Sequence, residues 1–267
     1  DANLPLLVAA RRMRIPTIAL QTKPLQQWDD AYLSAPPDPS HAICLPDCLC
    51  VFSSETKRRL VERGALEPSQ VLVTGDPRLE NLPAHGAKDE GESARLRRLW
   101  GVEKDQRVLY LGCESQELPE VLDWLAAGRR QDRRIFLLLG LPGRLRGEEA
   151  AARQIASSQD LHWHHLLRQE ALTDSMPGVD LVVTSDAHQV AEALLHQVPA
   201  AWIHRGPGDS SLPRPVPAGL ATVHDSASMS SLVAGFLAGE AVGNVSQDER
   251  EVFLDRTYGP RPGEASR

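Results

Sequence analysis

Short apolar runs alternate with stretches of helical periodicity along almost the whole chain of 267 residues, and this alternation restricts the possible folds more than any other feature. Each apolar run has the length of one strand, and most are followed by a stretch in which apolar residues recur every three or four positions. Strands that alternate with helices are joined by crossover connections, which build parallel sheets covered by helices. The sequence therefore predicts an α/β fold.

The expected elements form two series. The first series contains a helix at 6–14, a strand at 15–20, a strand at 48–52, a helix at 55–63 and a strand at 71–74. The second contains helices at 94–100, 118–127, 148–157, 187–196, 229–237 and 247–256, and strands at 108–111, 135–139, 161–164, 181–184, 200–203 and 221–223. Two such series predict two Rossmann-like domains with parallel sheets.

A polar segment rich in glycine and charge, residues 83–93, separates the two series, as is typical of a domain boundary. We expect residues 1–83 to form the remainder of an amino-terminal Rossmann-like domain, 84–106 a linker, 107–245 a second Rossmann-like domain, and 246–267 a carboxyl-terminal helix that crosses back toward the first. The first domain has three expected strands instead of about six, so we expect it to be incomplete. A cleft between the domains would face the carboxyl ends of both sheets, where such sheets bind ligands.

Composition and charge disfavour several functional classes. The net charge is −7, from 29 basic and 36 acidic residues without long runs of one sign, so no nucleic-acid partner is expected. No apolar run reaches the ~18 residues of a membrane span, and the first residues lack the pattern of a signal peptide. Four cysteines, three of them within residues 44–50, do not make a disulfide framework, which favours a reducing, cytoplasmic location.

The strongest sequence signal for a binding site lies in residues 179–195. A buried strand is expected to end at Thr184, a tight turn to follow, and a helix to begin near Ala187. The first backbone N–H groups of that helix, those of Ala187 and His188, would point into the cleft, where the helix dipole favours a phosphate group. The segment therefore predicts a phosphate site.

Glu192 follows His188 by one helical turn, so the two side chains share one face of the expected helix. A carboxylate at that position could accept both hydroxyl groups of a ribose. The alternative interpretation is that Ser185 or Asp186 only caps the helix and that Glu192 is solvated, because capping is what these residue types commonly do.

The spacing from Thr184 to Glu192, followed by Pro199 before a strand, resembles the donor-nucleotide site of GT-B-fold enzymes. The CDP-glycerol glycerophosphotransferases and related surface-polysaccharide transferases are most similar, followed by the UDP-N-acetylglucosamine 2-epimerases. Three further segments resemble these families in the same order along the chain, namely 14–21 (RIPTIALQ), 71–80 (VLVTGDPRLE) and 258–267 (YGPRPGEASR). The resemblance implies a GT-B fold and a nucleotide site formed by Gly112, Ser185, Asp186, Ala187, His188 and Glu192.

The chain departs from these families at positions that concern phosphate binding. Ala187 and His188 stand where the transferases have paired serines and the epimerases have two glycines, and residues 21–23 (QTK) replace a "QHG" sequence. Arg144 and Arg146, in the loop after the second strand of the second domain, could contact phosphate instead, because a guanidinium pairs well with phosphate oxygens. The alternative is that both arginines are simply solvated.

Other residues with chemical potential are better explained by structure. His162 and His164 would share one face of a strand, but two imidazoles are fewer than zinc needs, so no metal site is expected. Cys48 and Cys50 are expected to be buried in an apolar strand. Turn chemistry explains Asp76 better than catalysis does.

Three functions stay open. The first is a glycosyl- or glycerophosphotransferase that uses a nucleotide-activated donor, and no other cofactor, in the synthesis of a bacterial cell-surface polysaccharide or teichoic-acid-like polymer. Its acceptor would be a glycan or a lipid-linked molecule, which would allow peripheral association with the inner face of the membrane. Its general base would come from the first domain, so no catalytic residue is named. The second is an isomerase of the 2-epimerase type, and the third is a degenerate, non-catalytic GT-B protein that binds nucleotides.

Overall fold

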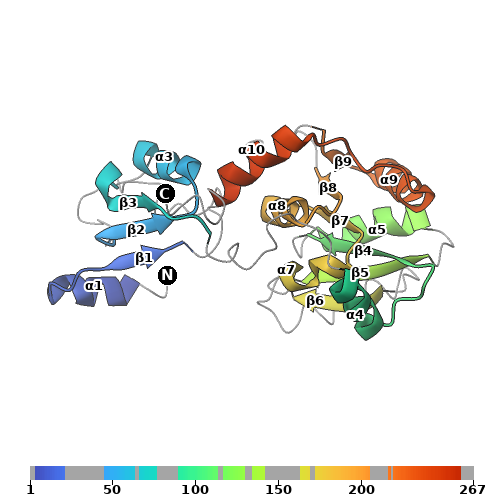
Figure 1. The fold of residues 1–267 in the computed structure, drawn as a ribbon, viewed down its shortest axis with the longest axis horizontal. Coiled ribbons are helices and arrows are strands. Elements are labelled where there is room, and N and C mark those ends of the chain that lie inside the picture. The colour runs from blue at the N-terminus through green and yellow to red at the C-terminus, as the bar shows by residue number, and fades with distance from the viewer. Residues whose placement is uncertain are drawn as a thin grey trace. The chain divides into compact units, whose positions relative to one another are not determined.

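The computed structural model describes residues 4–21, 45–63, 66–76, 90–113, 117–129, 134–141, 163–168, 172–204, 216–217 and 219–259. The chain divides into two compact units, which are residues 1–82 together with 251–267, and residues 83–250 (Figure 1). The domain limits expected from the sequence stay predictions. No helix in the described ranges has the length and apolar character that crossing a bilayer requires.

The first unit contains a parallel sheet of three strands in the order β1-β2-β3. Its described elements are α1 (Leu4–Arg12), β1 (Ile18–Leu20), β2 (Cys48–Val51), α3 (Ser54–Arg63), a short 3-10 helix η2 (Pro68–Gln70), β3 (Val71–Val73) and the greater part of α10 (Gln247–Tyr258). Leu49, Val51 and Val71 pack with Leu60 of α3 in a small core. One face of this sheet is therefore covered by α3.

The opposite face of β2 carries the two cysteines. Strand alternation places Leu49 and Val51 in the core and turns Cys48 and Cys50 to the other face, where both are half-buried. The expectation that both thiols are buried is therefore wrong, because each is only half-buried. Partial burial, followed by the neighbouring Cys48, raises the pKa of the Cys50 thiol, which favours its neutral form.

Asp76, after β3, is buried.

The second unit contains a parallel sheet of six strands in the order β6-β5-β4-β7-β8-β9. The strands are β4 (Arg107–Gly112), β5 (Ile135–Leu141), β6 (Trp163–Arg168), β7 (Leu181–Thr184), β8 (Ala200–Ile203) and β9 (Ala221–Val223). The chain proceeds outward from β4 through β5 to β6, and then returns to place β7 beside β4 and proceeds outward on the other side. The strand order therefore reverses between β4 and β7.

Helices cover both faces of this sheet (Figure 1). The described helices are α4 (Glu90–Trp100), α5 (Leu118–Arg129), α7 (Leu172–Ser175), the 3-10 turn η5 (Met176–Gly178), α8 (Ala187–Leu195) and α9 (Ser226–Ala238). Apolar side chains of α5 and α9 form one core with the strand residues of odd number, such as Leu109 and Leu111. Tyr110, on the other face of β4, is also fully buried. Burial on both faces is what a parallel sheet requires.

The α/β fold with parallel sheets is thus confirmed, while several boundaries differ from expectation. Helix α4 begins at Glu90, inside the segment expected to be linker, because Glu90 and Glu92 in its first turn interact favourably with the helix dipole. Strand β6 extends to Arg168, four residues beyond the expected end, while the expected positions 161 and 162 lie outside the described residues. The helix expected at 148–157 lies outside the described residues.

Candidate functional site

The carboxyl ends of three strands meet at the centre of the six-stranded sheet. Gly112 of β4 is paired with Gly140 of β5 on one side and with Thr184 of β7 on the other. Open α/β sheets bind ligands outside the carboxyl ends of their strands, where the strand order reverses. The structure therefore brings Gly112 and the segment that begins at Thr184 together at the position in the fold where a ligand is expected.

The side chain of Thr184 fixes the turn between β7 and α8. Its Oγ1 accepts a hydrogen bond of 2.9 Å from the N–H of Asp186 and donates one of 2.6 Å to Oε1 of Gln189. Thr184 is fully buried and Gln189 almost so. A buried hydroxyl with partners in both directions holds the start of α8 in one place relative to the strand.

Asp186 is the N-cap of α8. Its backbone is extended (φ −103°, ψ 114°), and its carboxylate Oδ1 accepts a hydrogen bond of 2.8 Å from the N–H of His188. The capping part of the alternative interpretation is therefore confirmed for Asp186, and one N–H group expected to serve phosphate has a partner within the protein. Within the described ranges, the N–H groups of Ala187 and Gln189 make no backbone hydrogen bond.

Glu192 is not solvated. The residue is 8% exposed, and its carboxylate Oε1 accepts a hydrogen bond of 2.7 Å from the hydroxyl of Thr173 on α7. The same oxygen lies 3.3 Å from Nε2 of His188, one helical turn away. The second oxygen, Oε2, has no hydrogen bond to any described residue, so it is the one that a ligand could use.

A second buried acid, Glu117, stands at the start of α5 beside this turn. The hydroxyl of Ser185 donates a hydrogen bond of 2.5 Å to Oε2 of Glu117, and the N–H of Ser185 donates to the carbonyl of Gly112. Glu117 was not selected from the sequence, although its place as an acidic residue at the start of the helix that follows β4 could have identified it as a site residue. The described residues hold no cluster of side chains suited to a metal ion.

Two glycines allow tight packing beneath the turn. A Cβ at Gly112 would lie 2.1 Å from Oε1 of Gln189, and a Cβ at Gly140 would lie 1.9 Å from Oη of Tyr110. Both Oη of Tyr110 and Nε2 of Gln189 are buried and have no hydrogen-bond partner in the described part of the chain. Burial, and then the charges of Glu192 and Asp186, raise the pKa of Tyr110, so its phenol stays neutral.

The two arginines expected to contact phosphate, Arg144 and Arg146, lie outside the described residues. The remaining site residues expected from the sequence lie close together in the fold. Gly112 is at the end of β4, beside the turn between β7 and α8. The others lie in that turn or in the first turns of α8, namely Ser185, Asp186, Ala187, His188 and Glu192.

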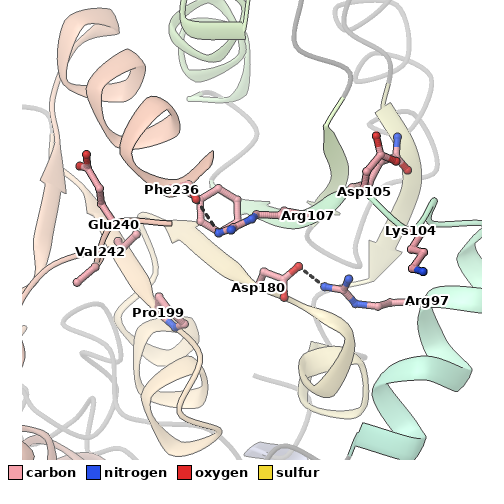
Figure 2. Close-up of a pocket in the computed structure, with 11 residues that line it drawn as sticks. Arg97, Lys104, Asp105, Arg107, Asp180, Pro199, Phe236, Glu240 and Val242 are labelled. Atoms are coloured by element: carbon pink, nitrogen blue, oxygen red, sulfur yellow. Dashed lines mark hydrogen bonds and ion pairs between the residues drawn. The ribbon is translucent and has the colours of Figure 1, made fainter. Parts of the chain in front are cut away.

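A pocket of about 450 Å³ lies at the opposite edge of the same sheet, at the amino ends of β4, β7 and β8 (Figure 2). Asp180 forms an ion pair with Arg97 of α4 and accepts a hydrogen bond of 2.8 Å from the N–H of Val108. Arg107 donates to the carbonyl of Phe236 at 2.7 Å and lies over its ring, 5.4 Å from the centroid. These charged groups join α4, β4 and α9 to one another, so we assign them a structural role.

The chain matches no protein-family model and no curated protein. Among solved structures it is similar to the Anabaena protein HepE in complex with UDP and glucose, with 13% identity and a TM-score of 0.54 over 95% of this chain and 70% of that one. It is similar to the wall teichoic acid polymerase TagF, with 13% identity and a TM-score of 0.60 over 94% of this chain and 65% of that one.

It is also similar to UDP-GlcNAc 2-epimerase from Neisseria meningitidis, with 13% identity and a TM-score of 0.57 over 98% of this chain and 70% of that one. This chain thus spans about two thirds of the length of these proteins. At this identity the similarity concerns the fold alone. The GT-B-type fold implied by the sequence resemblance is confirmed.

Proposed function

We propose that the chain belongs to a transferase that uses a nucleotide-activated sugar or glycerol phosphate, and that the nucleotide binds at the carboxyl ends of β4 and β7. One observation carries the proposal: Glu192, one turn into the helix that starts where the strand order reverses, is held by Thr173 with Oε2 still available. Structural neighbours described with UDP and glucose, CDPG or UDP-GlcNAc support a donor of this kind.

The contacts of the nucleotide follow from the geometry of α8. We assign the phosphate groups to the start of this helix, where the N–H groups of Ala187 and Gln189 are available among the described residues and the helix dipole attracts an anion. Glu192 would accept the ribose hydroxyls through Oε2. Gly112, at the end of β4, would contact the ligand through its backbone, because the space that a side chain would need is filled by Gln189.

The reaction would need positioning more than covalent chemistry from the protein. Transfer from a nucleotide donor requires that the departing nucleotide be stabilised and that the acceptor be held in line. The helix dipole of α8 would stabilise charge on the departing phosphate. We assign no general base to a described residue, and Arg144 and Arg146 stay proposed phosphate contacts.

The finer assignment is a role in bacterial cell-surface polysaccharide or teichoic-acid-like polymer synthesis, with a glycan or lipid-linked acceptor. It is supported by the structural similarity to TagF. The amino-terminal unit would bind the acceptor, and a lipid-linked acceptor would bring the protein to the inner face of the membrane.

An isomerase of the 2-epimerase type is the second candidate, because the fold is also similar to the enzyme from Neisseria meningitidis. It would use the same nucleotide site but would move a proton at the sugar ring. Incubation with UDP-N-acetylglucosamine alone separates the two: an epimerised product without any acceptor supports the isomerase, and unchanged substrate argues against it.

Thermal unfolding in the presence of CDP, UDP or GDP tests the nucleotide site. A ligand at 100 times its dissociation constant stabilises the folded state by about 2.7 kcal/mol, which is readily measured as a shift in Tm. Glu192→Gln should abolish most of this shift, because an amide cannot replace the carboxylate as acceptor of two ribose hydroxyls. Glutamine is preferred to alanine because it can still accept the hydrogen bond from Thr173.

The matched control is Glu240→Gln, which alters an exposed carboxylate at the opposite edge of the same sheet. It should leave the shift unchanged. If none of the three nucleotides stabilises the unsubstituted protein, or if Glu192→Gln retains the full shift, the proposed site is wrong.

A further inference from the structure

We propose that the Asp186 carboxylate is a built-in competitor of phosphate at the start of α8, because its negative charge beside the N–H of His188 lowers the affinity for a nucleotide. The inference rests on the proposed nucleotide function of the same site and adds a regulatory feature to it. It originates in the hydrogen bond of 2.8 Å between His188 N–H and Asp186 Oδ1.

The competition follows from what a helix start recognises. Unsatisfied N–H groups and the positive end of the helix dipole attract any anion, whether it is a phosphate or a carboxylate. Asp186 already supplies an anion to this position from within the chain. A phosphate that approaches α8 would meet a negative charge at the N–H that it would otherwise use.

The surrounding charges strengthen the effect. Glu117 is hydrogen-bonded to Ser185, and Glu192 lies one turn further along α8, so two more carboxylates accompany Asp186 near this turn. Residues 181–195 contain no lysine or arginine. His188 is the basic residue of this segment, and its Nε2 lies 3.3 Å from Glu192. The described site thus offers phosphate little counter-charge.

Hydrogen-bond donors are nevertheless present for a ligand rich in acceptors. Nε2 of Gln189, in the first turn of α8, is buried and has no partner among the residues that the structure describes, and Gln189 is 2% exposed. The N–H groups of Ala187 and Gln189 also have no backbone partner among the described residues. These donors could bind an anion, but the carboxylate of Asp186 lies beside them on the N–H of His188. We therefore infer that Asp186 limits the affinity of the site for anions.

Asp186→Asn tests this directly, because asparagine caps a helix as well as aspartate does while it removes the charge. Affinities for UDP and CDP are measured by calorimetry and compared with those for UMP, CMP, uridine and cytidine. We expect roughly tenfold tighter binding of the diphosphates, a smaller gain for the monophosphates and no change for the nucleosides, because a repulsion between charges scales with the charge of the ligand.

Asp174→Asn controls for the change in net charge, since Asp174 is an exposed acid at the start of α7. It should leave all affinities within about twofold, because exposed charges are screened by solvent and salt. Raising the salt concentration should also reduce the difference between the unsubstituted protein and Asp186→Asn. Should the asparagine variant fold poorly, Asp186→Ser keeps a capping hydroxyl and serves the same purpose.

The outcomes separate the two proposals. If the unsubstituted protein binds UDP or CDP and Asp186→Asn binds them no more tightly, the competition is overturned and the nucleotide site stands. A gain of equal size for nucleosides and diphosphates also overturns it, since charge would then not be the cause. If neither protein binds any of the nucleotides, the proposed function fails, and this inference fails with it.

Discussion

The hydroxyl of Thr173 donates a hydrogen bond of 2.7 Å to Oε1 of Glu192 and so connects α7 with the middle of α8. The same oxygen lies near Nε2 of His188, so both neighbours act on one side of the carboxylate. An almost buried acid is tolerated only when such partners compensate for its loss of hydration. Thr173 therefore orients the acid that is proposed to bind ribose.

Removing this hydroxyl should weaken the fold and the site together. Thr173→Val keeps the shape of the side chain but leaves the carboxylate of Glu192 without its donor, which we expect to cost about 1–3 kcal/mol of unfolding free energy. Urea denaturation measures the loss. Thr173→Ser retains the hydroxyl and should lose less, and equal losses in the two variants would argue that the hydrogen bond contributes little.

Removing the hydroxyl of Tyr110, in contrast, should not lower the unfolding free energy. Its Oη is fully buried and makes no hydrogen bond within the described ranges, so Tyr110→Phe should remove a polar group that gains nothing in the folded state. The unfolding free energy should stay the same or rise by up to about 3 kcal/mol. A midpoint of urea denaturation that falls by the equivalent of about 1 kcal/mol would show that the hydroxyl has a partner after all.

His196, the C-cap of α8, should make stability depend on pH. Burial lowers the pKa of its imidazole below the ordinary value of 6.5, so the unfolded chain binds a proton more readily than the folded chain does. The stabilisation is fully present above pH 6.5 and is lost as the pH falls from 6.5 through the lower pKa of the folded protein.

Urea denaturation of the unsubstituted protein and of His196→Gln, at a series of pH values, checks this prediction. Glutamine does not titrate, so the variant should lose less stability than the parent between pH 6.5 and the lower pKa. Parallel curves for the two proteins would contradict the assignment to His196.

Gly259, directly after α10, should not tolerate a side chain. Its φ is +79°, and a Cβ would lie 1.8 Å from the backbone carbonyl oxygen of Phe52, which belongs to the same compact unit. Gly259→Ala should therefore cost more than the roughly 1 kcal/mol typical of a positive φ alone. Because the neighbour is backbone, it cannot move aside by changing a rotamer.

Gly239→Ala is the matched control for that substitution. Its φ is +83°, but the nearest atom to an added Cβ is a side-chain nitrogen of Arg107 at 3.6 Å. Thermal unfolding of both variants should show a clearly larger loss at position 259. A loss of similar size at the two positions would mean that backbone conformation, and not the contact with Phe52, determines the cost.

The beginning of α8 is the part of the site that the sequence predicts best. A run of β-branched and apolar residues that ends at Thr184, followed by Ser185 and Asp186, contains both the strand and the capping signal of the next helix, because both are encoded in adjacent residues. The helix was expected to begin at Ala187, where it does begin. Local patterns suffice for such features.

The partners of that helix could not be predicted in the same way. Thr173 reaches Glu192 from a four-residue helix that was not expected, and Glu117 reaches Ser185 across 68 positions of the sequence. No local pattern contains these pairs, because they depend on the return of the chain from β6 to place β7 beside β4.

The sequence by itself determined the fold class and the place where β7 gives way to α8, since hydrophobic periodicity and capping are properties of neighbouring residues. Only the tertiary structure decided that Glu192 is buried and that Asp186 occupies the N–H of His188. The order of parallel strands and the direction of each side chain bring distant residues together, and that arrangement sets which polar atoms have partners and which are left for a ligand.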